Sequence, residues 1–529
     1  MGRWTEFGRG ILAVENLDDH EALAESLMSP ERWPEGGANR LRIDTHISTV
    51  ILAGEHAYKI KKPVDFGFLN FLDLDERHRY CQEELRLNRR LAPQIYLAVA
   101  AVTGSVASPH IDGKGEPIDW AVKMRRFDPD SLLSNPRTAL TNELIMELAK
   151  RVATFHQGAE TASGGSLGTP EQAYTAMRGN FDALRQHDKF TPELETLENW
   201  SEAQFSQLQP IMAQRLEEQH VRECHGDLHL GNIALVDDQP LVFDAIEFNP
   251  AFRWIDTISD VAFLTMDLRH RGRTDLAHVF LDCYLEHSGD YAALCLLRIY
   301  EVYRALVRAK VAAIRQQQPE VSAQEQETLE KELHRYVELA GHIAKSSQPG
   351  IVITSGVSGS GKSRVTRDLP AKLSAIRVRS DVERKRLLNI RPEDSATEAG
   401  GYSEQVTERT YARLEQLAQL IIDAGYLAVV DATFLKREQR TRFRKLAERN
   451  KVPFFIVACD APTELLCERI ESRSHKSGNV SDADLQILQM QQESLEPLDE
   501  NERACRITKP VSEQSIAKQL AQRLKETST

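Results

Sequence analysis

The sequence lacks the cysteine pattern of a disulfide-rich or zinc-binding protein. Its 529 residues include 7 cysteines, an odd number, and no two of them form a C-x-x-C pair. No group of histidine, cysteine and aspartate residues has the spacing of a zinc site. We therefore expect neither a disulfide framework nor structural zinc, and this cysteine usage is typical of a reducing compartment.

Long apolar runs and an excess of basic residues are also missing. No stretch is long enough to cross a bilayer, and the first residues contain no apolar segment of signal-peptide length, so we expect a cytoplasmic protein. Acidic side chains outnumber basic ones by 79 to 66, which gives a net charge of −13. Binding to anionic membranes and non-specific binding to nucleic acid are disfavoured, because both depend on clustered Lys and Arg. A local basic cleft remains compatible with this charge.

One interruption divides the sequence into two patterns. Residues 346–350 read S-S-Q-P-G, and small polar residues followed by Pro-Gly predict a domain boundary. After it, apolar strands alternate with helices, which is typical of an open parallel sheet. Before it, β-branched runs and helical periodicity predict strands at 48–53, 57–61 and 120–127, and helices at 75–91, 142–156, 282–314 and 322–343.

A phosphate-binding loop opens the second pattern. Residues 356–363 read G-V-S-G-S-G-K-S, a full match to G-x-x-x-x-G-K-[ST], directly after an apolar strand. The glycines allow backbone N–H groups to surround phosphate oxygens, and the following helix adds its positive end. We expect the lysine to reach the β- and γ-phosphates and the last serine to bind Mg²⁺. The predicted nucleotide-binding residues are Gly356, Val357, Ser358, Gly359, Ser360, Gly361, Lys362 and Ser363.

Three further places in this half carry candidate chemistry. Asp381 and Asp431 each follow a predicted strand, and ligands of open α/β sheets lie at the carboxyl ends of strands. Arg384 follows Asp381 by three residues, and Arg469 and Arg473 lie one helical turn apart. Taken alone, each acid is equally typical of a helix N-cap, and the last two arginines are typical of a solvated helix face.

This half resembles the P-loop small-molecule and polynucleotide kinases, among them gluconate kinase and chloramphenicol phosphotransferase. The resemblance covers about residues 349–510 and depends on G-V-S-G-S-G-K-S, S-D-V-E-R, V-V-D-A-T-F and the paired arginines. It implies that Asp381 takes the proton from the accepting hydroxyl and that Arg384 contacts substrate or phosphate. It also implies that Arg469 and Arg473 close over the transferred group and that Asp431 supports the metal.

A second constellation lies in the first half. Residues 225–232 read H-G-D-L-H-L-G-N, and Asp244 ends an apolar run soon after. Phosphoryl transfer needs an acceptor for the hydroxyl proton, which suits Asp227, and oxygen ligands for Mg²⁺, which suit Asn232 and Asp244. A hairpin between the two segments would bring the three side chains into one cleft. Read alone, the first segment is equally typical of a turn with buried histidines.

This constellation resembles the aminoglycoside phosphotransferase and choline kinase branch of the protein-kinase-like fold, over about residues 35–315. The resemblance implies that Lys59, with Lys61 as the alternative, neutralises the nucleotide phosphates and that Glu84 pairs with it. It also implies that adenine is held near Met124 and that Asp260 braces the catalytic loop. No G-x-G-x-x-G precedes Lys59, and the metal segment reads D-A-I-E, so Glu247 either shares the metal or has another task.

The two resemblances predict a multidomain chain of mixed α/β and α+β class. We expect a bilobal protein-kinase-like domain followed by a P-loop NTPase domain with a parallel sheet. The predicted boundaries are 1–127 for the first lobe with its N-terminal extension, 128–345 for the helical lobe, and 349–525 for the P-loop kinase domain.

The leading functional hypothesis is a bifunctional kinase that uses ATP and Mg²⁺ to phosphorylate hydroxyls of small molecules. Two alternatives remain open at this stage. In one, a half that binds ATP without useful turnover acts as a sensor for the other half. In the other, the P-loop half phosphorylates 5′-hydroxyl ends of polynucleotides, which the acidic net charge disfavours. The acceptors and the oligomeric state are not specified by the sequence.

Overall fold

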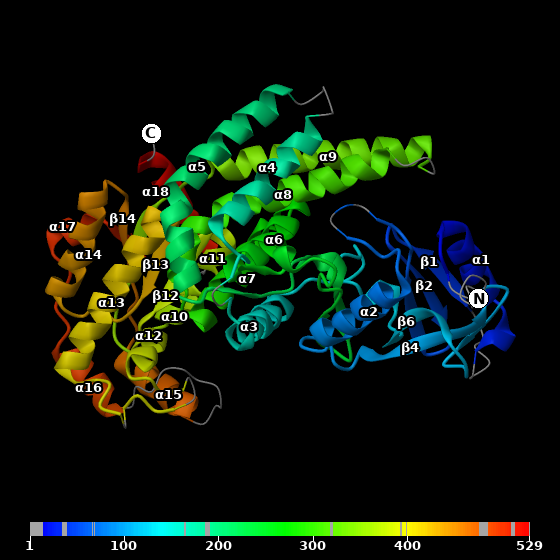
Figure 1. Cartoon of the computed structure of the whole chain (residues 1–529). Helices are drawn as coiled ribbons and strands as arrows, with labels where there is room; N and C mark the ends of the chain where they lie inside the picture. Colours follow the sequence, from blue (N-terminus) through cyan, green and yellow to red (C-terminus); the bar gives the residue numbers. More distant parts are fainter. Residues whose placement is uncertain are drawn as a thin grey trace, which may run out of the picture. The chain divides into compact units, whose positions relative to one another are not determined.

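The structure is a computed structural model that describes most of the chain, and Figure 1 traces its elements. It divides into two compact units, each with segments from several parts of the sequence. The first unit contains residues 1–141, 158–174 and 210–260, and the second contains 142–157, 175–209 and 261–529. The described residues are 14–33, 40–65, 67, 69–162, 165–185, 191–317, 321–391, 394–397, 399–474, 485–508 and 514–527.

The first unit is built on a six-stranded antiparallel sheet. Its order is β1-β2-β3-β6-β4-β5, so β6 lies beside β3 although α2, β4 and β5 separate them in the sequence. The predicted strand pair is confirmed, because Ala53 and His56 face each other across a turn in which Gly54 has a φ of 58°. The strands are β1 (Leu41–Asp44), β2 (Ser48–Ala53), β3 (His56–Lys61), β4 (Tyr96–Ser105), β5 (Ser108–Ile111) and β6 (Pro117–Arg125).

Helices pack against the two faces of this sheet. Tyr58 and Ile60 of β3 face α1 (Leu17–Leu27) in one apolar cluster. Ala57 belongs to the cluster on the opposite face, together with Cys81 and Leu85 of α2 (Leu74–Asn88). Because side chains alternate along a strand, Lys59 and Lys61 lie on the α2 side. Both lysines therefore point toward α2, the helix that carries Glu84.

Short strands and a hairpin complete the first unit. β7 (Val221–Glu223) pairs with β10 (Trp254–Asp256), and β8 (Ile233–Val236) pairs with β9 (Gln239–Val242). Ala234 and Leu241 of the hairpin join the α2-side core of the sheet. The expected hairpin between Asn232 and Asp244 is therefore present, and it is anchored in the same core as β3.

The second unit joins a helical region to a parallel sheet. The sheet order is β12-β13-β11-β14-β15, with all neighbours parallel, as the alternating pattern after residue 350 predicts. The strands are β11 (Gly350–Ser355), β12 (Ala375–Arg379), β13 (Leu427–Asp431), β14 (Phe454–Ala458) and β15 (Arg506–Thr508). The crossover and flanking helices are α10 (Lys362–Thr366), α11 (Leu369–Leu373), α12 (Ser380–Leu387), α13 (Glu404–Asp423), α14 (Arg437–Asn450), α15 (Thr463–Ser474), α16 (Leu485–Glu493), α17 (Glu500–Ala504) and α18 (Gln514–Thr527).

The helices before the sheet differ from the prediction in two ways. Helices at Pro170–Leu184, Thr191–Glu217 and Thr257–His270 were not predicted, and one predicted helix is divided. The helix expected at 282–314 is two helices, because Gly289 ends the first with a φ of 75° and α8 begins at Leu294. No helix in the described ranges is long and apolar enough to span a membrane. The helices are α3 (Asn142–Gly158), α4 (Pro170–Leu184), α5 (Thr191–Glu217), α6 (Thr257–His270), α7 (Thr274–Ser288), α8 (Leu294–Gln316) and α9 (Ala323–Lys345).

Within the second unit, α7 packs against the edge strand of the sheet. The carboxylate of Asp282 accepts a hydrogen bond from the backbone N–H of Arg377 at 2.7 Å, and Glu286 pairs with Arg379 at 3.1 Å. Burial raises the pKa of the Asp282 carboxyl to about 6. The segment 346–350 lies between α9 and β11, as predicted, while the three domain boundaries remain predictions.

Candidate active sites

Lysines and carboxylates form a buried cluster on the α2 side of β3. The Nζ of Lys59 lies 2.9 Å from Glu84 and 2.6 Å from Asp244. Lys61 pairs with the other oxygen of Glu84 at 2.7 Å. Burial lowers the pKa of Lys59, but the charges of Asp244 and Glu84 outweigh that effect and hold it well above its ordinary value. Glu84 therefore stabilises both lysines, and Lys59 is the one that reaches Asp244.

Glu247 also belongs to this cluster. Its carboxylate pairs with Lys61, and the side chains of both residues are almost fully buried. Burial raises the pKa of Glu247, while the charge of Lys61 opposes that shift. The sequence left open whether Glu247 shares the metal or has another task. The structure favours another task, that of an ion-pair partner for the buried Lys61.

The segment H-G-D-L-H-L-G-N forms a tightly braced loop after β7. The backbone N–H groups of His225 and Gly226 each donate to the carboxylate of Asp260 at 2.9 Å. Gly226 has a φ of 86°, and a Cβ there would meet the backbone oxygen of Phe252 at 2.7 Å. Only glycine fits this position, because other residues would suffer both backbone strain and a clash. The brace that the resemblance implied for Asp260 is present in this geometry.

Asp227 and Asn232 lie together in this loop. The amide nitrogen of Asn232 donates to the Asp227 carboxylate at 2.9 Å and to its backbone oxygen at 3.0 Å. His229 also approaches the carboxylate, at 3.3 Å. The side chain of Asp227 is 33% exposed, so it is held in place and still reachable by a substrate. These features suit an acceptor for a hydroxyl proton.

Asp244 begins a short segment, residues 244–247, that we call the metal loop. Asp244 has a φ of 64°, and its N–H donates to the Tyr96 hydroxyl at 3.2 Å. The next N–H, of Ala245, donates to the side-chain oxygen of Asn88 at 2.8 Å. Residue-by-residue reading of the sequence missed Tyr96 and Asn88, because their role depends on contacts across about 150 residues.

The donor set of this site fits Mg²⁺. The Asp244 side chain is 43% exposed although one of its oxygens contacts Lys59. The amide nitrogen of Asn232 is used by Asp227, which leaves its oxygen as the atom suited to a metal. Carboxylate and amide oxygens are the hard ligands that Mg²⁺ prefers. Met124, the residue expected near adenine, lies within β6 beside Ala57 and Tyr96.

The phosphate-binding loop of the second unit has the backbone shape that its glycines predict. Gly356, Gly359 and Gly361 have φ values of 145°, 82° and 93°. A Cβ at Gly356 would lie 2.1 Å from the backbone oxygen of Cys459. The Nζ of Lys362 donates to the oxygen of Val357 at 2.8 Å, so the lysine curls back over the loop. The loop leads directly into α10, which begins at Lys362.

The two acids of this half lie near the loop. Asp431 is buried at the end of β13 and accepts a hydrogen bond from Thr366 at 3.0 Å. Asp381 lies in the first turn of α12 and pairs with Arg384 at 2.9 Å. Neither carboxylate caps a helix: the N-cap position of α12 is Arg379, which makes no side-chain cap bond. Arg384 in turn lies over the ring of Tyr402 at 4.7 Å.

A cavity of about 330 Å³ brings most of these residues together. Its lining includes Gly361, Lys362, Ser363, Asp381, Arg384 and Asp431. Arg469 is not among the lining residues, but it donates to the backbone oxygen of Gly359, which is one of them, at 3.0 Å. The side chain of Arg473 lies outside the described residues. Gln491, which the sequence did not indicate, accepts a hydrogen bond from the N–H of Ser358 at 2.7 Å.

The two halves match two different protein families. Residues 69–297 match the Phosphotransferase enzyme family, and residues 351–498 match an AAA domain. The chain is 31% identical over 458 residues to two uncharacterized proteins, Rv2004c of Mycobacterium tuberculosis and Mb2027c of Mycobacterium bovis. Each alignment covers 84% of this chain and 88% of the relative.

Several solved structures are similar to parts of this chain. A gluconokinase from Sinorhizobium meliloti is 22% identical, covers 35% of this chain and 100% of its own, and has a TM-score of 0.25. The APS kinase CysC of Mycobacterium tuberculosis, in complex with AMPPNP and APS, is 25% identical over 34% of this chain and 99% of its own, with a TM-score of 0.26. The GDP and kanamycin complex of APH(2")-IIia is 13% identical over 58% of this chain and 94% of its own, with a TM-score of 0.36.

Proposed function

We propose that this phosphotransferase, which belongs to one family with the two mycobacterial proteins, transfers the γ-phosphoryl group of ATP at two separate sites. The acceptors are hydroxyl groups of small molecules. The observation that carries the proposal is that each unit brings together a lysine and carboxylates in an arrangement suited to phosphoryl transfer. The first arrangement lies around Lys59 and Asp227, and the second lines the cavity at Lys362.

In the first site, Asp227 orients the acceptor hydroxyl and takes its proton. Lys59 neutralises charge on the nucleotide phosphates while Glu84 holds the lysine in place. Asn232 and Asp244 would hold Mg²⁺, which on binding would neutralise the charge that develops on the phosphate oxygens. The contact of 2.6 Å between Lys59 and Asp244 keeps the phosphate-binding and metal-binding groups adjacent.

In the second site, backbone N–H groups of residues 356–363 and Lys362 bind the phosphates. Asp381 serves as the proton acceptor, and Arg384 fixes its carboxylate from one turn further along α12. Ser363 would bind Mg²⁺, and Asp431 would support that ion through Thr366. Arg469 is placed by its bond to Gly359 to act on the loop, and Arg473 lies one turn further along α15.

The compartment proposed for this chemistry is the cytoplasm. All seven cysteines are free thiols in the structure, and four of them are buried. Thiols persist where the environment is reducing, and cytoplasmic ATP is available there to both sites.

Two variants test the proposal by separating the sites. Asp227→Asn removes the proton acceptor of the first site, and Lys362→Ala removes the phosphate-binding lysine of the second. Each variant is incubated with Mg-ATP and an extract of small metabolites, and phosphorylated products are identified by a mass gain of one phosphate. We expect each substitution to abolish a different product. If both variants retain every product, the proposed function is wrong.

A further inference from the structure

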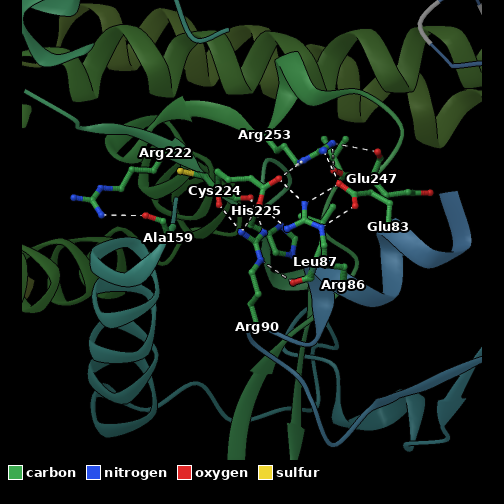
Figure 2. Close-up of polar contacts among 12 residues, drawn as sticks. Glu83, Arg86, Leu87, Arg90, Ala159, Arg222, Cys224, His225, Glu247 and Arg253 are labelled. Carbon is green, nitrogen blue, oxygen red and sulfur yellow. Dashed lines mark hydrogen bonds and ion pairs between the residues drawn. The ribbon is translucent and has the colours of Figure 1, made fainter. Parts of the chain in front are cut away.

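Arg253 is a buried arginine that contacts three functional parts of the first unit. It is 5% exposed and follows the short 3-10 helix at Pro250–Phe252. Its Nη1 donates to the backbone oxygen of Glu247 at 3.1 Å, and its Nη2 donates to the side chain of Glu83 at 2.7 Å. Its Nε donates to Glu223 at 3.1 Å. One guanidinium thus joins the metal loop, α2 and β7 (Figure 2).

The two carboxylates that hold Arg253 are close in the sequence to residues of the first site. Glu83 directly precedes Glu84, the partner of Lys59. Glu223 lies two residues before His225, where the braced loop begins. Arg253 therefore connects the residues beside the lysine partner with the residues beside the proton acceptor.

Two further arginines, Arg86 of α2 and Arg90 just after its end, strengthen the link between α2 and β7. Arg86 pairs with Glu223 at 2.7 Å, and Arg90 pairs with it at 3.1 Å. Arg90 also donates to the backbone oxygen of Glu223 at 2.7 Å. Figure 2 shows these guanidinium groups gathered with that of Arg253 near Cys224 and His225, where the braced loop begins. The α2–β7 joint is thus built from charge-assisted hydrogen bonds, which are stronger than neutral ones.

The backbone of the metal loop is bound on several sides. Asn88, at the end of α2, accepts from the N–H of Ala245, and the oxygen of His225 accepts from the N–H of Ile246 at 3.1 Å. Arg253 also binds this loop: it donates hydrogen bonds to the backbone oxygens of Glu247, at 3.1 Å, and Ile246, at 3.4 Å. Among the described residues, Arg253 is the side chain that binds the metal loop, α2 and β7 at once.

We propose that Arg253 is a positioning residue that fixes the metal loop to α2, so that Asp244 and the Lys59–Glu84 pair stay in register. The inference rests on the proposed function, because it assigns Arg253 to the first phosphotransfer site. The guanidinium of Arg253 is buried and bonds to groups of the protein itself. A lysine at this position would keep the charge but would lose the planar fork that contacts three partners together.

The test uses the full chain carrying Lys362→Ala, so that nucleotide binding reports the first site. Into this background we introduce Arg253→Lys, and Arg222→Lys as the matched control. Arg222 lies on β7 next to Glu223, and its guanidinium donates to the backbone oxygen of Ala159. A second variant, Glu83→Gln, weakens the α2 end of the link without opening a cavity, and Glu76→Gln on the exposed face of α2 is its control.

Two readouts follow each variant. The first is amide hydrogen exchange of residues 244–247 in the ligand-free protein. The second is the Mg²⁺ concentration that gives half-maximal ATP binding, measured beside the affinity for ATP without Mg²⁺. For Arg253→Lys we expect faster exchange in the metal loop and a Mg²⁺ requirement raised about 10- to 100-fold, with metal-free ATP affinity within about twofold of the parent. For Glu83→Gln we expect a smaller change in the same direction.

The outcomes separate the inference from the function on which it rests. If the parent binds ATP but Arg253→Lys and Glu83→Gln match their controls in both readouts, Arg253 does not position the metal loop. Equal loss of ATP affinity with and without Mg²⁺ would also refute the inference, because it would indicate general damage to the fold. If the parent with Lys362→Ala binds no ATP, the proposed first site is wrong, and the inference fails with it.

Discussion

Lys61→Met is the substitution whose effect on stability follows most directly from the structure. Lys61 is fully buried and pairs with both Glu84 and Glu247. After the substitution Glu84 keeps its ion pair with Lys59 at 2.9 Å, but Glu247, with a side chain 4% exposed, loses the lysine with which it pairs. Leaving one member of a buried ion pair without its partner costs about 3–5 kcal/mol. We expect a loss of that size in the opening free energy of the first unit.

Amide hydrogen exchange of β3 measures this loss, because core strands exchange through the largest opening reactions of their unit. A cost of about 3–5 kcal/mol speeds the exchange by about two to four powers of ten. The double variant Lys61→Met with Glu247→Met leaves no unpaired charge, and replacing a buried pair by apolar side chains is often neutral. We expect the double variant to lie within about 2 kcal/mol of the parent.

Two results would refute this reasoning. If Lys61→Met changes the exchange of β3 by less than a factor of about five, the buried pair contributes little. If the double variant is as unstable as the sum of the single variants, the two side chains are not coupled. A rise in the Mg²⁺ requirement of Glu247→Met without a loss of stability would instead make Glu247 a metal ligand.

Two further predictions concern the second unit. The pKa of the Asp282 carboxyl in the folded protein, about 6, is raised above the ordinary value of 3.8. The protonated form therefore stabilises the packing of α7 on β12. That contribution to stability is complete below about pH 4 and is lost as the pH rises through 6. Asp282→Asn should therefore gain stability relative to the parent between pH 4 and pH 8, by up to about 3 kcal/mol in urea unfolding, and a difference independent of pH would contradict this. Thr366→Val removes the hydroxyl that donates to Asp431 at 3.0 Å. It should raise the Mg²⁺ requirement of the second site about tenfold in ATP-binding titrations, whereas an unchanged requirement would show that Asp431 does not act through Thr366.

Local features of the sequence predicted much of the fold. The β2–β3 pair was predicted almost to the residue, because alternation and the turn at Gly54 depend only on neighbouring residues. The same holds for the phosphate-binding loop, whose glycines need positive φ values. The break between α7 and α8 was missed although residues 286–290 read E-H-S-G-D, and Gly289 ends the helix with a φ of 75°.

The supporting residues of the first site were beyond prediction from local patterns. Asn88, Tyr96 and Arg253 act on the metal loop through contacts that only the folded chain creates. The role of Glu247 could not be predicted either, because the sequence does not show whether its carboxylate lies beside a metal or beside a buried lysine. Lys61 shares the strand face of Lys59, and only packing decides which of them reaches Asp244.

The number of nucleotides bound by one chain tests the central claim most directly. Equilibrium dialysis with a non-hydrolysable ATP analogue and Mg²⁺ should give two nucleotides per parent chain. Lys362→Ala should reduce the count to one, and adding Lys59→Met to that variant should reduce it to none. A parent chain that binds a single nucleotide, lost entirely in Lys362→Ala, would contradict the existence of a second phosphotransfer site around Lys59 and Asp227.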